Sequence, residues 1–65
     1  MPIVRVEMWA GRPQKIKGKI AQEITDTMVR NLGCPEEAVT ILFTDVAKED
    51  WVIGSKSCAE LFPNR

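Results

Sequence analysis

The chain has 65 residues, with nine Lys and Arg, nine Asp and Glu, no His and a formal net charge of +0. A chain of this length forms one domain, here residues 1–65. The balanced charge argues against a nucleic-acid-binding protein, which normally carries a basic excess. No apolar run approaches the roughly 20 residues of a membrane-spanning helix.

A domain this small needs support beyond its own hydrophobic core. Cys34 and Cys58 allow at most one disulfide, and the lack of His and of a Cys-x-x-Cys pair argues against structural zinc. The start of the chain shows no basic segment of a signal peptide, so we expect a cytoplasmic protein with reduced thiols. Oligomerisation is therefore the expected support.

Residues 3–9 predict a β-strand because polar and apolar side chains alternate with a period of two. One face carries Val4, Val6 and Met8, and the other carries Ile3, Arg5, Glu7 and Trp9. The strand is expected to end at Ala10–Gly11, where glycine allows the chain to turn.

Residues 13–32 predict an amphipathic helix. Pro13 suits the first helical position, where its missing N–H is no loss. An apolar stripe recurs every four residues and consists of Ile16, Ile20, Ile24 and Met28. Gly33 is suited to end the helix in a left-handed conformation.

Residues 38–46 predict a second strand that is apolar on both faces and is therefore covered on both sides. Val39, Ile41 and Phe43 share one face with each other, and Thr40, Leu42 and Thr44 share the opposite one. Residues 51–53 form a short third strand that stops at Gly54–Ser55, and the remaining tail packs against the rest of the chain or a neighbour.

The order strand, helix, strand predicts a right-handed crossover with parallel strands. The fold class is α/β (α+β): a small β-α-β subunit with a short C-terminal strand or hairpin. One helix covers only one face of a two-stranded sheet, and such a sheet is marginal alone. We therefore predict that other copies of the chain extend the sheet and bury its bare face, giving a homo-oligomer.

These elements and several short motifs together resemble the 4-oxalocrotonate tautomerase family over nearly the whole chain. The matching pieces, in chain order, are Pro2-Ile3, Gly11-Arg12, Pro35, Thr44-Asp45-Val46-Ala47-Lys48, Trp51 and Ile53-Gly54. No single piece is specific. Their combined spacing in a chain of this length is what carries the resemblance.

The resemblance implies a tautomerase-like domain assembled as dimers, usually three in a hexamer. It implies keto–enol isomerisation, without a cofactor or metal, of an unsaturated 2-oxo acid or dienol such as 2-hydroxymuconate. Pro2 matches the catalytic proline of the family. Arg12 matches an arginine that binds the carboxylate of a small-molecule substrate, and Trp51 matches an aromatic residue that forms the apolar wall of the site. Neither a nucleic acid nor a membrane is expected as a partner.

Three positions depart from the family pattern. A second arginine, supplied by a neighbouring subunit, is replaced by Thr40, and Arg5, Lys48 and Arg65 are candidates to compensate. Val52 and Ser55 replace smaller residues. These departures leave two alternatives open. One is a proline-dependent dehalogenase, hydratase or decarboxylase, and the other is a weakly active or non-catalytic subunit of a hetero-oligomer.

The chemistry depends on the nitrogen of Pro2, which becomes a secondary amine only if Met1 is removed. An apolar pocket and the nearby charge of Arg12 would both lower the pKa of that amine toward the working pH. The planar fork of Arg12 suits a carboxylate, and the ring of Trp51 would exclude water.

Each of these residues also has an ordinary structural interpretation. Proline often begins a strand, an arginine commonly solvates a turn, and a tryptophan commonly fills a core or an interface. Three acidic residues at and beyond the end of the second strand are interpreted as solvent-facing, namely Asp45, Glu49 and Asp50.

Overall fold

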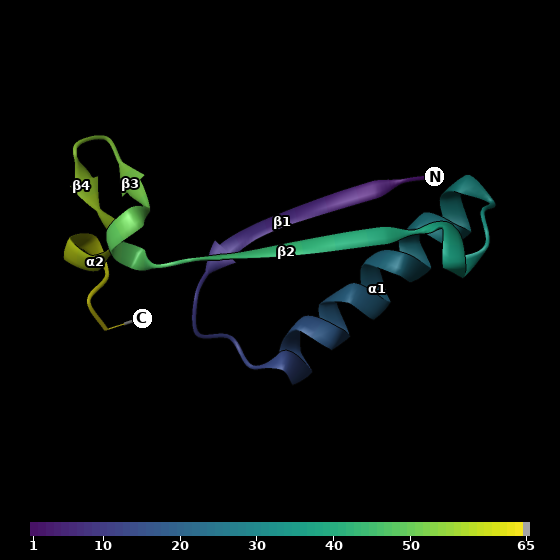
Figure 1. Ribbon diagram of the computed structural model, residues 1–65, viewed down its shortest axis with the longest axis horizontal. Helices are drawn as coiled ribbons and strands as arrows, with labels where there is room; N and C mark the ends of the chain where they lie inside the picture. The colour runs from purple at the N-terminus through teal and green to yellow at the C-terminus, as the bar shows by residue number, and fades with distance from the viewer. Residues whose placement is uncertain (65) are drawn as a thin grey trace.

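The computed structural model describes residues 1–64 and contains a β-α-β unit followed by a small hairpin (Figure 1). The unit consists of β1 (Ile3–Trp9), α1 (Gln14–Leu32) and β2 (Thr40–Val46). The hairpin consists of β3 (Val52–Ile53) and β4 (Lys56–Ser57), and the short helix α2 (Cys58–Leu61) follows it. Within residues 1–64, no helix combines the length and apolar character that crossing a membrane requires.

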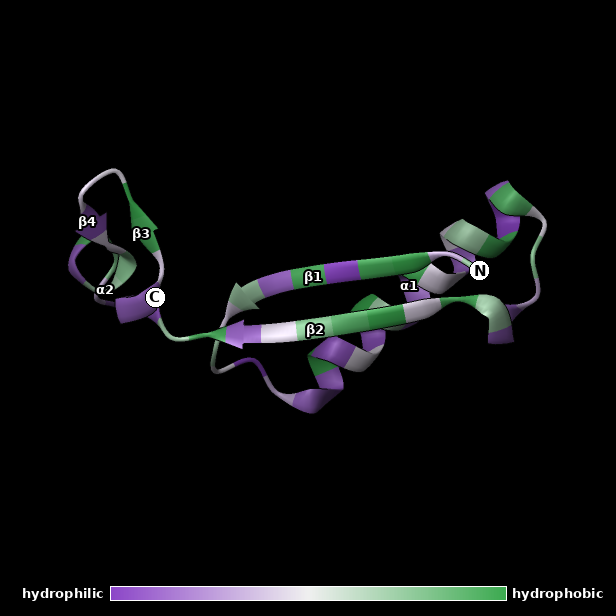
Figure 2. Cartoon of the chain, turned by 45° about the horizontal axis from the view of Figure 1, so that its top comes forward, coloured by the Kyte–Doolittle hydropathy of each residue, from purple (hydrophilic) through white to green (hydrophobic). Residues whose placement is uncertain are grey.

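The two long strands are parallel, as the crossover argument predicts. Their register runs from Ile3 opposite Thr40 to Trp9 opposite Val46. Polar and apolar positions alternate along β1, as Figure 2 shows by colour. Because neighbouring residues in register point to the same side, Val4 and Val6 share a face with their partners on β2, Ile41 and Phe43.

The helix α1 covers that shared face. The predicted stripe is half-buried at Ile20, Ile24 and Met28, whereas Ile16 remains 42% exposed near the start of the helix. An ion pair of 2.7 Å between Lys17 Nζ and Asp45 Oδ2 also links α1 to the end of β2. One face of the sheet is therefore covered from within the same chain.

Three predicted boundaries were wrong by one or two residues, one of them the start of the short strand predicted at residues 51–53, which begins at Val52. The second strand begins at Thr40, and Glu36–Ala38 form a 3₁₀ turn instead. Thr40 N–H donates to Pro2 O (3.0 Å), and the residues before Thr40 have no strand residue opposite them to pair with. Pro13 is the N-cap of α1 rather than its first helical residue, because its ψ of 155° is extended.

The C-terminal segment forms the predicted hairpin and packs on itself. Gly54 has a φ of 66°, which glycine adopts without strain in the turn between β3 and β4. Cys58 N–H donates to Trp51 O (2.7 Å), and Cys58 is fully buried, the only such residue within 1–64. Cys34 and Cys58 do not form a disulfide.

The single chain is neither compact nor well buried. Its radius of gyration is 14.8 Å, whereas a compact chain of this length has a value of about 11 Å. The face of the sheet opposite α1 is bare, with Ile3 60% and Leu42 45% exposed. We call this surface the bare face; it carries Ile3, Arg5, Glu7 and Trp9 of β1 and Thr40, Leu42, Thr44 and Val46 of β2. Its exposed apolar side chains fit the expectation that other copies cover it.

Replacing Leu42 with glutamate is expected to disrupt assembly, because it puts a charged side chain, which is costly to bury, in place of an apolar one in the middle of the bare face. Sedimentation velocity should show a smaller mass for Leu42→Glu than for the parent protein at the same concentration. Lys19→Glu is the matched control, since it introduces the same side chain on the exposed side of α1 and should keep the parental mass. A Leu42→Glu protein with the parental mass would show that the bare face is not an interface.

Candidate functional site

Pro2 lies just before β1 and is anchored to the neighbouring strand. Its carbonyl accepts the hydrogen bond from Thr40 N–H (3.0 Å), and the residue is half-buried. Met1, which is joined to the nitrogen of Pro2, is 91% exposed. The structure therefore holds Pro2 at the end of the sheet, and the residue that blocks its nitrogen projects into solvent.

Arg12 lies at the opposite end of β1, in the connection to α1. Ala10 N–H donates to Val46 O (2.9 Å), which extends the pairing of the strands by one residue before the chain turns. Arg12 follows this turn and is exposed. Its guanidinium forms no ion pair or hydrogen bond within residues 1–64 and is therefore available to bind an anion.

Trp51 belongs to an aromatic cluster at this same end of the sheet. The ring of Trp9 meets the ring of Trp51 edge to face, with centroids 6.4 Å apart, and lies 5.5 Å from that of Phe62. Lys48 Nζ donates to Phe62 O (2.8 Å) and lies 4.9 Å from the centre of the Trp9 ring. Trp51 thus takes part in packing, one of its two predicted roles.

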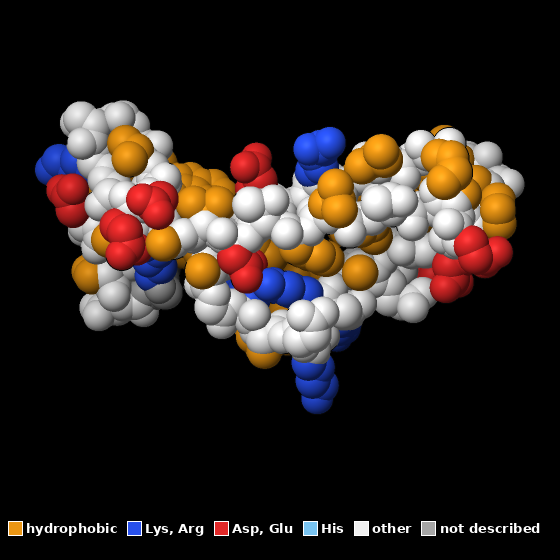
Figure 3. Space-filling view, viewed as in Figure 1, with side chains coloured by type: hydrophobic (Ala, Val, Ile, Leu, Met, Phe, Trp, Pro, Cys, Tyr) orange, Lys and Arg blue, Asp and Glu red, His pale blue; other side chains and the backbone are white. Residues whose placement is uncertain are grey.

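Trp51 also lines a hollow of about 250 Å³ on the bare-face side of the sheet, so the position suits the predicted wall role as well. The other lining residues are Glu7, Val46 and Asp50. Figure 3 shows acidic side chains gathered over the hairpin end of the molecule. Asp50 is exposed, in agreement with its interpretation as a solvent-facing residue, and it also forms part of this concave surface.

The sequence analysis missed three residues of this region: Glu7 and Trp9 on β1, and Asp50 after β2. Glu7 and Trp9 share the face of β1 that turns away from α1, and the period of two already indicated this. Nothing in the sequence indicated that Asp50 would line the same hollow as Glu7, since this depends on how the chain turns after Val46. The structure therefore adds two carboxylates and one indole to the predicted set.

One chain does not bring the three predicted site residues together. Pro2 and Trp9 are separated by seven residues of extended chain, or about 23 Å at roughly 3.3 Å per residue. Trp51 contacts Trp9, and Arg12 follows it closely, so both lie far from Pro2 (Figure 1). A site that contains all three residues must therefore combine the N-terminal end of one chain with the hairpin end of another.

The candidates to compensate for Thr40 differ in their surroundings. Thr40 itself is exposed beside Pro2 and carries no charge. Lys48 is already engaged with Phe62 O and the Trp9 ring. Arg5 is exposed on the bare face and forms no ion pair within residues 1–64, and Arg65 lies outside the described residues.

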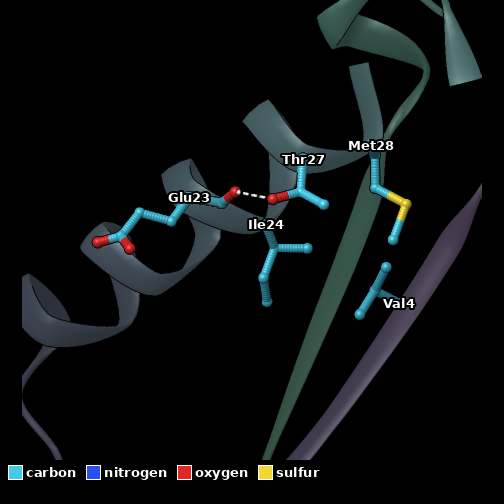
Figure 4. Close-up of a pocket in the computed structure, with 5 residues that line it drawn as sticks. All are labelled: Val4, Glu23, Ile24, Thr27 and Met28. Atoms are coloured by element: carbon cyan, nitrogen blue, oxygen red, sulfur yellow. Dashed lines mark hydrogen bonds between the residues drawn. The ribbon is translucent and has the colours of Figure 1, made fainter. Parts of the chain in front are cut away.

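A second hollow, of about 330 Å³, lies between α1 and β1 and contains none of the predicted site residues. Figure 4 shows Val4 facing Ile24 and Met28 across it. The hydroxyl of Thr27 at its rim donates to Glu23 O (3.1 Å). Among the described residues that line it, Glu23 is the one titratable residue, and its exposed carboxylate points away from Val4, Ile24 and Met28 in Figure 4. Within residues 1–64, no three His, Cys, Asp or Glu side chains form a group that could hold a metal ion.

The fold and the motif positions identify the class of protein. A model of the family described as tautomerase enzyme matches residues 2–60. The chain belongs to the tautomerase family, and its relatives place it with the 4-oxalocrotonate tautomerases. It is 33% identical over 61 residues to the 2-hydroxymuconate tautomerase of Comamonas testosteroni, an alignment that covers 94% of this chain and 97% of that protein.

Two solved structures are similar in fold as well as in sequence. A 4-oxalocrotonate tautomerase isozyme from Methylibium petroleiphilum has a TM-score of 0.87 and 31% identity, covering 94% of this chain and 98% of that one. A heterohexameric 4-oxalocrotonate tautomerase from Chloroflexus aurantiacus has a TM-score of 0.86 and 26% identity, with the same coverage of both chains. The predicted fold class and family are thus confirmed.

Proposed function

We propose that this chain is a cofactor-independent tautomerase that uses the nitrogen of Pro2 to move a proton within the enol of an unsaturated 2-oxo acid, such as 2-hydroxymuconate. The observation that carries the proposal is the anchoring of Pro2. Its carbonyl is held by Thr40 N–H (3.0 Å), while Met1 is 91% exposed and accessible to an aminopeptidase. Removal of Met1 then leaves a fixed secondary amine at the end of the sheet.

The proton transfer needs only one group that both accepts and returns a proton. The neutral amine of Pro2 takes the proton from the enol hydroxyl, and the electrons of that O–H bond form the carbonyl. The double-bond electrons of the enol then take the proton from the Pro2 ammonium at a carbon of the conjugated chain. No electrons are gained or lost, so the step requires no redox partner.

Arg12 and Trp51 complete the site in this proposal, and a neighbouring copy supplies them. The exposed guanidinium of Arg12 binds the substrate carboxylate through its planar fork. The ring of Trp51 excludes water, which strengthens the electrostatic interactions in the site. The separation of Pro2 from these two residues within one chain supports a homo-oligomer, which we propose is a hexamer built as a trimer of dimers and acts in the cytoplasm.

A ketonisation assay tests the proposal. The assay follows the loss of enol absorbance of 2-hydroxymuconate and phenylenolpyruvate, using protein whose intact mass shows that Met1 is absent. We expect turnover by the pure homo-oligomer. Turnover only after co-purification with a second, related chain would instead support the hetero-oligomer alternative, and a Met1-free protein inactive on both enols would contradict the proposal.

The pH dependence of kcat/KM distinguishes a Pro2 base from a Pro2 acid. A base acts in its neutral form, so kcat/KM should rise with pH as the amine loses its proton and then reach a plateau. The proline-dependent hydratase and dehalogenase alternatives need the ammonium form. For them, activity falls as pH rises through the same titration. A pH–rate profile of the Met1-free protein is the measurement, and a falling profile would rule out the base role.

A further inference from the structure

The hollow beside Trp51 is acidic as well as partly apolar. Glu7 and Asp50 line it together with Val46 and Trp51. Neither carboxylate has an ion pair within residues 1–64, where the one ion pair joins Lys17 to Asp45. A ligand that lies against Trp51 therefore meets two uncompensated negative charges as well as an apolar wall.

Few cations are available to balance a ligand of high negative charge. Lys48 is committed to Phe62 O and the Trp9 ring and does not line the hollow. Arg5 lies two residues from Glu7 on the same face of β1, and Arg5, Glu7 and Asp50 together still sum to −1. The position beside Pro2 on β2 is the neutral Thr40.

Among the described residues, Arg12 is therefore the cation that binds a substrate carboxylate in the proposed site. One guanidinium pairs well with one carboxylate. A second carboxylate on the same substrate would be left without a partner in a site that already contains Glu7 and Asp50. An apolar or aromatic substituent in the same place would instead pack against Trp51 and Val46.

We infer that the site selects enols of 2-oxo acids that carry a single carboxylate and an apolar or aromatic tail, and discriminates against dicarboxylates. This inference rests on the proposed tautomerase function and narrows its substrate class, so that phenylenolpyruvate is the better substrate and the dicarboxylate 2-hydroxymuconate the poorer one. Like charges a few ångströms apart near a protein surface repel strongly enough to lower affinity roughly tenfold. Neutralising Glu7 and Asp50 should therefore raise the affinity of the site for a dicarboxylate roughly tenfold.

The test compares kcat/KM for phenylenolpyruvate, which has one carboxylate, and 2-hydroxymuconate, which has two. The parent protein should prefer phenylenolpyruvate. In Glu7→Gln/Asp50→Asn the ratio of the two kcat/KM values should fall roughly tenfold, mainly through a lower KM for 2-hydroxymuconate. Glu49→Gln is the matched control, because Glu49 lies in the same turn but does not line the hollow, and its ratio should stay at the parental value.

Binding provides a readout that does not depend on turnover. Titration of tryptophan fluorescence with phenylpyruvate and with 2-oxoadipate compares a monoacid and a diacid in the same hollow. The monoacid should bind more tightly to the parent, and the double substitution should narrow the difference. A parent protein that prefers the diacid, or a double variant with unchanged selectivity in both experiments, would overturn the inference.

The two levels of the proposal fail in different ways. If Pro2→Ala leaves ketonisation unchanged, the tautomerase mechanism is wrong, and the substrate inference falls with it. If ketonisation requires Pro2 but the selectivity does not respond to Glu7→Gln/Asp50→Asn, the mechanism stands and the substrate inference alone is rejected.

Discussion

Replacing Pro2 with alanine is expected to lower kcat/KM for enol ketonisation by roughly 10²- to 10⁴-fold, the usual contribution of a positioned acid–base group. Aminopeptidases remove an initiator methionine that precedes either proline or alanine, so the two proteins can be compared in the same processed form. The variant has a primary amine without the ring that fixes its position. Because the Thr40 N–H to Pro2 O hydrogen bond involves only backbone atoms, the fold should persist.

Steady-state ketonisation of phenylenolpyruvate is the measurement, with intact mass confirming the loss of Met1 in each sample. Pro35→Ala is the control, since Pro35 lies in the connection after α1, next to the 3₁₀ turn that precedes β2, and should keep activity within about twofold of the parent. A fraction that retains Met1 should be at least as inactive as Pro2→Ala, because its Pro2 nitrogen is an amide and cannot accept a proton. Equal rates for the parent and Pro2→Ala would remove Pro2 from the mechanism.

Mixed oligomers of Pro2→Ala and Arg12→Ala chains are expected to regain activity that neither variant has alone. Arg12→Ala should lose roughly 10²-fold in kcat/KM, because the carboxylate loses its charged partner. Pro2 and Arg12 lie at opposite ends of β1, so in the proposed assembly each site takes them from different copies. Random equimolar mixing then leaves both residues intact in about one quarter of the sites of a symmetric assembly.

The mixed oligomers can be produced by co-expression with two different affinity tags and isolated by sequential purification. Activity near one quarter of the parental value would support a site shared between chains. The control mixes Pro2→Ala with the doubly substituted Pro2→Ala/Arg12→Ala chain, in which no site can be complete. Mixed oligomers that are no more active than this control would show that Pro2 and Arg12 do not act in a shared site.

Local periodicity was sufficient to predict the main elements. The period of two in residues 3–9 and the four-residue recurrence from Ile16 to Met28 each specify which side chains share a face, whatever the rest of the chain does. The beginning of β2 was predicted less well, because residues 38 and 39 are apolar enough for a strand. Only the absence of a partner before Ile3 shows that pairing begins at Thr40.

The residues of the candidate site could be predicted, but their arrangement in space could not. Pro2, Arg12 and Trp51 were selected through the resemblance to the family, since no local pattern distinguishes a catalytic proline from one that simply begins a strand. Their assignment to different ends of the sheet follows from the length of β1. The assembly that would reunite them remains a prediction of the proposed function.

The sequence by itself determined the β-α-β order, the side chains that share a face of each strand, and the family, because these depend on short-range periodicity and motif spacing. The tertiary structure decided that Glu7 and Asp50 line one hollow with Trp51, and that Thr40 stands beside Pro2. These neighbours are distant in the chain. They meet because the parallel register and the turn after Val46 bring the segments together, and local sequence patterns do not encode such long-range contacts.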